Sequence, residues 1–199
     1  MAPPYDFAIC IDAGHGGHDN GTTVRGFREA DANLDIAGAA VDALAADVRL
    51  VLPTRVTDHF LSLEARARMA NAHDAWMLSV HCNSLPLWSR WISQARGAEA
   101  LVHSYASPGA ALGRVVLAEL RGVGMPTSSQ GIVERPNLAV LKLTKRPAVL
   151  IECGYASSGA DRDMLDDKAW RLRAGVAIAR GVLGFLAAEV VRGHGAAAV

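Results

Sequence analysis

The sequence contains few cysteines, and their arrangement does not suit disulfide bonds. There are three in 199 residues, Cys10, Cys82 and Cys153, and they are widely separated and form no CxxC pair. Small domains that depend on disulfides carry a denser, even-numbered set. We therefore expect no disulfide framework and three small buried thiols.

An excess of charge of one sign is also missing. The 20 Lys and Arg residues balance 20 Asp and Glu residues, and no segment is rich in Lys and Arg. Arg66 and Arg68 alternate with alanine, a pattern typical of an ordinary helix surface. Because binding of nucleic-acid phosphates needs a local excess of basic residues, we expect no nucleic-acid partner.

A long uninterrupted apolar segment is absent as well. The most apolar stretch, residues 176–191, contains Arg180 and Glu189, so we expect no transmembrane helix and no membrane anchor. The first six residues lack the basic region of a signal peptide, and residues 7–11 are too short to be its apolar core. The chain is therefore expected to be soluble, and either made in the cytoplasm or exported with its signal removed.

Short β-rich runs alternate along the chain with helical patterns. The apolar fraction of 51% is sufficient for a core, and the length suits one domain. The alternation predicts an α/β fold, a single domain over residues 1–199 with a mostly parallel central sheet of about six strands flanked by helices. The core should span about 7–188, with a loose tail at about 193–199. The predicted strands are 7–12, 48–52, 76–81, 98–103, 138–141 and 148–152, and the predicted helices are 31–48, 63–71, 109–121 and 161–191, the last in one or two pieces.

The first polar cluster lies where the first predicted strand ends, in the glycine-rich segment Asp12–Asp19. Glycines at positions 14, 16 and 17 would hold His15 at the strand end, where sites gather in parallel sheets. A plain turn with a solvated histidine is the simpler interpretation. A phosphate-binding loop is not indicated, because the GxGxxG and Walker A spacings are absent.

Two further residues complete a possible metal site. Glu29 lies just before a predicted helix, and alone it is better explained as an acid that the helix dipole favours. His81 ends the third predicted strand and could be a hydrogen-bonded edge residue. Together, His15, Glu29 and His81 form a His₂Glu set, a ligand shell used by catalytic zinc, which keeps a position open for water.

A carboxylate also ends the most apolar predicted strand. Glu152 follows Ala148–Ile151, where a carboxylate is rare unless it is paired or functional. Strand alternation directs Glu152 and Cys153 to opposite faces. Glu152 is therefore the candidate general base, which takes a proton from the activated water and passes it to the leaving amine. The alternative is an acid at the sheet edge that accepts hydrogen bonds from loop amides.

In order and context, these motifs resemble the zinc-dependent N-acetylmuramoyl-L-alanine amidase family known as Amidase_3. The resemblance covers about residues 7–188. The matching segments are Asp12–Gly17, Arg28–Leu34, Thr54–Arg55, Leu61–Arg66, Ala70–Asn71, Ser79–Asn83, Ala95–Gly97, Asn137–Leu141 and Pro147–Tyr155.

The resemblance implies Zn²⁺ on His15, Glu29 and His81, with Glu152 as the catalytic acid and base. The implied reaction is hydrolysis of the amide between N-acetylmuramic acid and L-alanine in peptidoglycan. The implied place of action is the cell wall, as an autolysin or as a phage or prophage endolysin that waits in the cytoplasm until lysis. Some relatives carry a helical insertion that blocks the zinc site, and residues 97–137 have room for little beyond a strand, one helix and a loop, so we expect an enzyme that needs no activator protein. We also expect a monomer.

Several positions and functions remain open at this point. His18 is an extra candidate ligand but is expected to be exposed, and Cys82 could bring sensitivity to oxidation. Trp88 and Trp91 could form a rim for sugar or peptide, or pack under a loop. A zinc peptidase acting on stem peptides and a non-catalytic peptidoglycan-binding domain are the main alternatives. A cysteine hydrolase is disfavoured, because no cysteine-enzyme signature is present.

Overall fold

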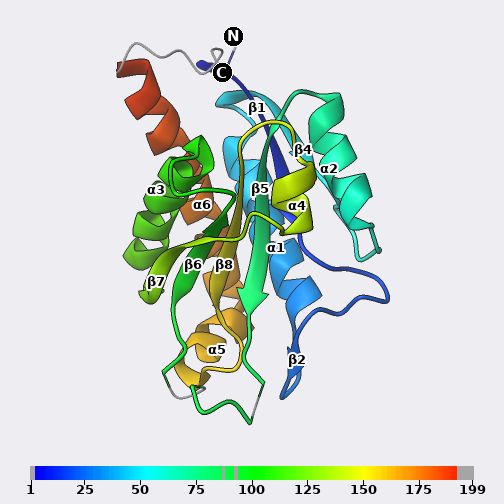
Figure 1. Ribbon diagram of the computed structural model, residues 1–199, viewed down its shortest axis with the longest axis vertical. Helices are drawn as coiled ribbons and strands as arrows, with labels where there is room; N and C mark the ends of the chain where they lie inside the picture. Colours follow the sequence, from blue (N-terminus) through cyan, green and yellow to red (C-terminus); the bar gives the residue numbers. More distant parts are fainter. Residues whose placement is uncertain (1–2, 87, 92–93, 192–199) are drawn as a thin grey trace.

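The computed structural model describes residues 3–86, 88–91 and 94–191. Their centre is a six-stranded sheet with the strand order β4-β1-β5-β8-β6-β7 (Figure 1). Neighbouring strands are parallel except β6 and β8, which are antiparallel. This confirms the predicted fold class. The predicted tail at 193–199 lies outside the described residues. The strands are β1 Tyr5–Ala13, β4 Val48–Pro53, β5 Trp76–Asn83, β6 Ala98–Val102, β7 Thr127–Glu134 and β8 Ala148–Tyr155.

One predicted strand is wrong and one strand was not predicted. Residues 139–141 belong to a short helix, α4 Ala139–Leu143, and Leu138 is its N-cap. The prediction failed because a brief apolar run has no periodicity that separates strand from helix. The sixth strand is instead β7, whose first half is polar and only partly buried and is followed by Gly131 at a φ of 61°. Such an edge strand lacks the alternating apolar pattern that reveals strands in a sequence.

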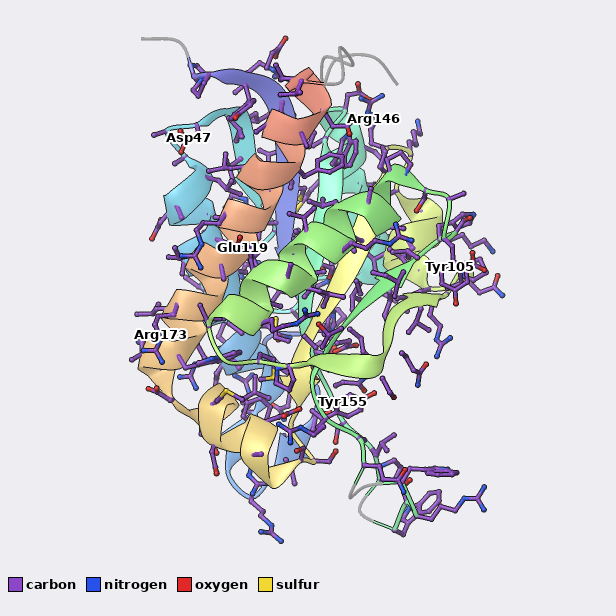
Figure 2. The ribbon with its side chains drawn as sticks, turned by 90° about the vertical axis from the view of Figure 1, so that its left-hand side faces the viewer. Asp47, Tyr105, Glu119, Arg146, Tyr155 and Arg173 are labelled. Carbon is purple, nitrogen blue, oxygen red and sulfur yellow. The ribbon has the colours of Figure 1, made fainter. Side chains whose placement is uncertain are left out.

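Helices cover both faces of the sheet and bury two apolar clusters. The face carrying α1 Glu29–Leu44, α3 Pro108–Gly122 and α6 Lys168–Val191 holds the larger cluster, and Figure 2 shows α3 and α6 crossing it. The other face carries α2 Leu63–Ala72, which begins at the predicted N-cap Ser62, and α4. A two-stranded hairpin, β2 Thr23–Val24 and β3 Phe27–Arg28, precedes α1, and α5 Gly159–Asp166 precedes α6.

Helix α6 is apolar on several sides because neighbouring elements bury it. By length and composition alone it could cross a membrane, because an 18-residue stretch of it has a mean hydropathy of 1.8. The prediction that this part of the chain is not apolar enough for such a span is therefore wrong. Half of that 18-residue stretch is buried within the fold. At Gly175 and Gly181 the helix approaches the backbones of α1 and α3 so closely that a Cβ would collide with Ile36 and Val116. A helix enclosed in this way needs apolar residues around most of its circumference.

The strand directions bring the polar candidates to one edge of the sheet. The carboxyl ends of β1, β5 and β8 lie together there, at the lower end in Figure 1. Because β6 is antiparallel to β8 and parallel to β7, the amino ends of β6 and β7 lie at the same edge. The site described next is built from these strand ends and from the first residue of α1.

Candidate active site

His15 lies in the loop after β1, and two buried arginines hold the backbone of that loop. The φ of His15 is 60°, a left-handed conformation that a non-glycine residue keeps only where its surroundings fix it. Arg66 donates from Nη2 to the His15 carbonyl oxygen (2.7 Å), and Arg55 donates from Nη2 to the Gly14 carbonyl oxygen (2.9 Å). The loop is thereby fixed with the His15 ring directed at α1.

Glu29, the first residue of α1, joins the two histidines. Its Oε1 lies 3.1 Å from His15 Nε2 and 3.0 Å from His81 Nδ1, and it accepts a hydrogen bond from the Cys82 backbone N–H (3.1 Å). Its Oε2 accepts one from the Thr22 backbone N–H (2.8 Å). One ligand atom from each of His15, Glu29 and His81 lies within 4.8 Å of the other two, so the three form a group that could hold a metal ion.

Two neighbouring side chains orient this group. Asp19 Oδ2 lies 2.9 Å from His15 Nδ1, which leaves Nε2 facing Glu29. Buried Asn33 donates from Nδ2 to Glu29 Oε1 and to the Gly14 carbonyl oxygen, both at 3.3 Å. Carboxylate partners of this kind fix the ring orientation of metal-binding histidines and are an expected part of such a centre. Neither partner was predicted from the sequence.

The cluster has strongly coupled ionisation. Burial opposes the charged form of His15, but hydrogen bonds from its ring to Glu29 and Asp19 outweigh burial and raise the pKa of His15 to about 9. The pKa of Glu29 is held far below its usual range, since the two histidines outweigh its burial. A bound divalent cation would take the place of the protons that these groups share.

Two glycines make room for the ligands. A Cβ on Gly14 would lie 2.3 Å from the ring of His81, and a Cβ on Gly21 would lie 2.6 Å from both the Glu29 carboxylate and the His15 ring. Gly21 also has a φ of 62°. Gly14, in the first glycine-rich motif, and Gly21, just after it, therefore allow close packing around His15, Glu29 and His81.

Glu152 lies beside the cluster in a row of polar residues. It is in register with His81 on β5 and with Glu99 on β6, so the three side chains share one face of the sheet. Its Oε2 is buried and has no hydrogen-bond partner among the described residues. Burial raises the pKa of Glu152 to about 7; the carboxylates of Glu29 and Glu99 add to this, while His81 opposes it. This environment suits a carboxyl group that both accepts and donates a proton.

A buried ion pair between Arg66 and Asp12 stabilises the loop that carries His15. Arg66 donates from Nη1 to Asp12 Oδ1 (2.7 Å), and the same carboxylate accepts hydrogen bonds from Thr54 Oγ1 (2.7 Å) and Ser79 Oγ (2.5 Å). Arg66 is only 3% exposed. Its interpretation as helix surface is therefore wrong, because spacing within one helix does not reveal a partner 54 residues away.

The remaining candidates lie outside the group formed by His15, Glu29 and His81. His18 is exposed and its ring packs against Phe60, with centroids 4.2 Å apart. All three cysteines are buried and unbridged, as predicted, and burial raises the pKa of each thiol, which disfavours a cysteine nucleophile. Trp88 and Trp91 are 86% and 52% exposed, so they do not pack under a loop.

Comparisons with known proteins agree with this geometry. At 30% identity, the chain is similar over 177 residues to the uncharacterized protein YqiI of Bacillus subtilis, covering 87% of this chain and 82% of that protein. It is 29% identical over 180 residues to the N-acetylmuramoyl-L-alanine amidase LytC of the same organism, covering 89% of this chain but only 35% of LytC.

A solved structure and a family model complete the comparison. The N-acetylmuramoyl-L-alanine amidase of Clostridium difficile 630 superposes with a TM-score of 0.80 at 29% identity, and the match covers 92% of this chain and 98% of that one. The model of the Amidase_3 family, described as N-acetylmuramoyl-L-alanine amidase, matches residues 9–183. That match extends over most of the chain and includes all four candidate site residues. The chain belongs to the N-acetylmuramoyl-L-alanine amidase family Amidase_3.

Proposed function

We propose that this protein is a zinc-dependent amidase that hydrolyses the bond between N-acetylmuramic acid and L-alanine in peptidoglycan. The observation that carries the proposal is the convergence of His15, Glu29 and His81 beside Glu152. A ligand group for a metal and a proton-transfer group are thereby adjacent at one edge of the sheet. Family membership supplies the choice of scissile bond.

The residues present fit zinc. Two imidazoles and one carboxylate are a common protein shell of catalytic zinc, and the glycines at 14 and 21 leave the space that the ligands need. Zinc held by His15, Glu29 and His81 would supply Lewis acidity toward the scissile carbonyl and toward water. Asp19 and Asn33 would keep the ligands oriented.

In this proposal Glu152 transfers the proton. It accepts a proton from the attacking water and donates it to the nitrogen of the departing L-alanine, so the C–N bond breaks as a carboxylic acid and an amine form. A pocket of about 350 Å³ opens at the cluster, between His15 and His81 on one side and the apolar side chains Phe60 and Leu63 on the other. This pocket is the place for the reacting carbonyl group and the adjoining sugar.

The proposal also concerns the setting of the reaction. We propose that the protein acts on the cell wall outside the cytoplasm, as an endolysin or an autolysin, and that it works as a monomer. Between Gly97 and Asn137 the described chain forms only β6, α3, β7 and their connections. This is consistent with an enzyme that needs no activator protein, because no additional helix is available there to block the cluster.

Metal removal tests the proposed function. Wild-type protein is expected to contain about one zinc per chain and to release stem peptides with new L-alanine amino termini from purified peptidoglycan. A chelator should abolish release, and added zinc should restore it. New amino termini at other residues would indicate a peptidase, and wall binding without release would indicate a binding domain. Activity that survives complete removal of zinc would overturn the assignment of the metal site.

A second prediction concerns the glycine beside His81. Gly14→Ala should weaken zinc binding roughly 10- to 100-fold, the range seen when the surroundings of metal ligands are disturbed, because its Cβ would displace the His81 ring. Competition with a fluorescent chelator measures the affinity. Gly38→Ala on α1 is the matched control, since nothing lies within 4 Å of its new methyl group. Equal zinc affinity in the two variants would contradict the geometry described here.

A further inference from the structure

A second pocket, of about 320 Å³, lies beyond Glu152, on the side away from the metal cluster. The buried residues Glu99 and Tyr155 form part of it, and Figure 2 shows Tyr155 at this end of the sheet. The segment after β5 and the start of β7 supply the other walls. Lining side chains from these two segments include Trp91, Gln94, Arg96, Ser129 and Gln130.

The carboxylate of Glu99 in this pocket already accepts hydrogen bonds from within the protein. Glu99 Oε1 accepts hydrogen bonds from Ser128 Oγ (2.7 Å) and Tyr155 Oη (2.9 Å), and Glu99 Oε2 accepts one from Asn83 Nδ2 (3.3 Å). Glu99 is 4% exposed. A ligand in the pocket therefore meets chiefly the side chains of the walls, which offer hydrogen-bond donors and one aromatic surface.

The order of the strands indicates the direction in which the substrate peptide extends from Glu152. Glu152 on β8 lies between His81 on β5 and Glu99 on β6. The leaving nitrogen must lie next to the group that protonates it, so the peptide begins at Glu152 and continues away from the metal cluster. Strands are about 4.8 Å apart, and an extended peptide spans about 3.5 Å per residue. The second residue of the departing peptide therefore reaches the pocket.

The arginine side chain that lines this pocket, Arg96, is available to bind a ligand. Arg96 is exposed, and within the described part of the chain it forms no ion pair or hydrogen bond. The arginine of the metal-side pocket differs, because Arg66 is fully engaged with Asp12 and with backbone carbonyls. A guanidinium group presents paired donors that match the two oxygens of a carboxylate.

We propose that the pocket beneath Trp91 holds the acidic second residue of the stem peptide and that Arg96 binds the free α-carboxylate of this residue. This inference rests on the proposed function. Gln94, Ser129 and Gln130 contact the polar backbone of the peptide, and the sugar lies on the opposite side of Glu152, toward Phe60 and Leu63. Arg96 thus selects walls whose second stem residue is not amidated.

Two synthetic substrates test the selection. Both are muramoyl tetrapeptides, and they differ only in the α-group of the second residue, a carboxylate in one and a carboxamide in the other. Wild type should cleave the carboxylate form with a kcat/KM about 10- to 100-fold higher, the range expected for a hydrogen-bonded charge pair. Arg96→Gln should lose this preference by slowing the carboxylate form alone. Arg114→Gln, an exposed arginine on α3, should retain the wild-type preference.

Binding of the free tetrapeptides separates this inference from the proposed reaction. On an inactive Glu152→Gln background, calorimetry should detect tighter binding of the carboxylate form, and adding Arg96→Gln should remove the difference. This result would support the pocket even if the scissile bond were another one. If Arg96→Gln weakens both peptides equally, or neither, the assignment of Arg96 is overturned. Cleavage of neither substrate by zinc-loaded wild type would count against the proposed function instead.

Discussion

Glu152→Gln is expected to lower kcat/KM for peptidoglycan hydrolysis by about 1,000-fold, within the range that general acid–base catalysis contributes. The amide has nearly the same shape as the carboxyl group but cannot take a proton from water and return it to the leaving nitrogen. Glu152 lies beside His81 without belonging to the ligand group, so the variant should keep its zinc. Release of amino termini and metal analysis of the same sample measure both properties.

The control for this substitution is another glutamate-to-glutamine change, far from the site. Glu119→Gln on α3 removes only a partly exposed ion pair with Arg180 on α6, at the place where the two helices meet (Figure 2). Its activity should equal that of wild type. If Glu152→Gln retained more than a tenth of wild-type activity, another group would have to transfer the proton. If it lost its zinc, the loss of activity would no longer report on catalysis.

Arg66→Met is expected to destabilise the fold by about 3–5 kcal/mol, the usual effect of removing one partner of a buried ion pair. Asp12 would remain 1% exposed, with its charge balanced only by the hydroxyl groups of Thr54 and Ser79. The carbonyl oxygen of His15 would also lose its donor, and that of Ala13 would keep only the hydrogen bond from Arg55 Nε. Denaturant unfolding, monitored by circular dichroism, measures the change in the free energy of unfolding.

The same helix provides the control. Arg68 is two residues further along α2 and exposed, so Arg68→Met should change the free energy of unfolding by less than about 0.5 kcal/mol. Asp12→Asn combined with Arg66→Met should recover part of the loss, because the unpaired charge is then gone. An Arg66→Met protein within 1 kcal/mol of wild type would show that the pair is not needed, as about that much is the average effect of any substitution.

Acid should weaken the same network in wild type. Burial disfavours the charged form of Asp12, but Arg66 and the hydroxyl donors outweigh it and keep the pKa of Asp12 below its usual range. A carboxylate whose pKa is lowered by folding contributes stability above its unfolded pKa of about 4, and this contribution is lost as the pH falls through its folded pKa. The pair therefore stabilises the loop of His15 at neutral pH.

The sequence predicts those parts of the site that depend on strand ends. His15, His81 and Glu152 each follow an apolar run, and the carboxyl ends of parallel strands meet at one edge, so their proximity could be inferred. Glu29 could not be chosen on local grounds, since an acid at a helix start has a simpler explanation. Its assignment depended on the His₂Glu set that it completes with His15 and His81 and on the family motif, and the structure brings it into the cluster.

The parts that were missed depend on contacts across the fold. Asp12 and Arg66 are 54 residues apart, and an arginine between alanines has the local pattern of a surface residue. Strand β7 is a polar edge strand, and its pairing with β6 is visible only once the sheet exists. The pocket with Arg96 joins residues from three separate segments, so no single motif could indicate it.

The reversed direction of β6 places the proposed peptide-binding residues and the proposed catalytic residues in separate segments of the chain. Because β6 is antiparallel to β8, the connection from β5 to β6 starts after Asn83 and ends before Ala98 at the same edge of the sheet. His81 precedes this connection and Glu99 follows it, each on a strand that the sheet holds in place. Because the proposed peptide-binding residues Trp91, Gln94 and Arg96 lie in this connection, we expect that changing their identity alters which peptides are accepted while the proposed reacting groups stay in place.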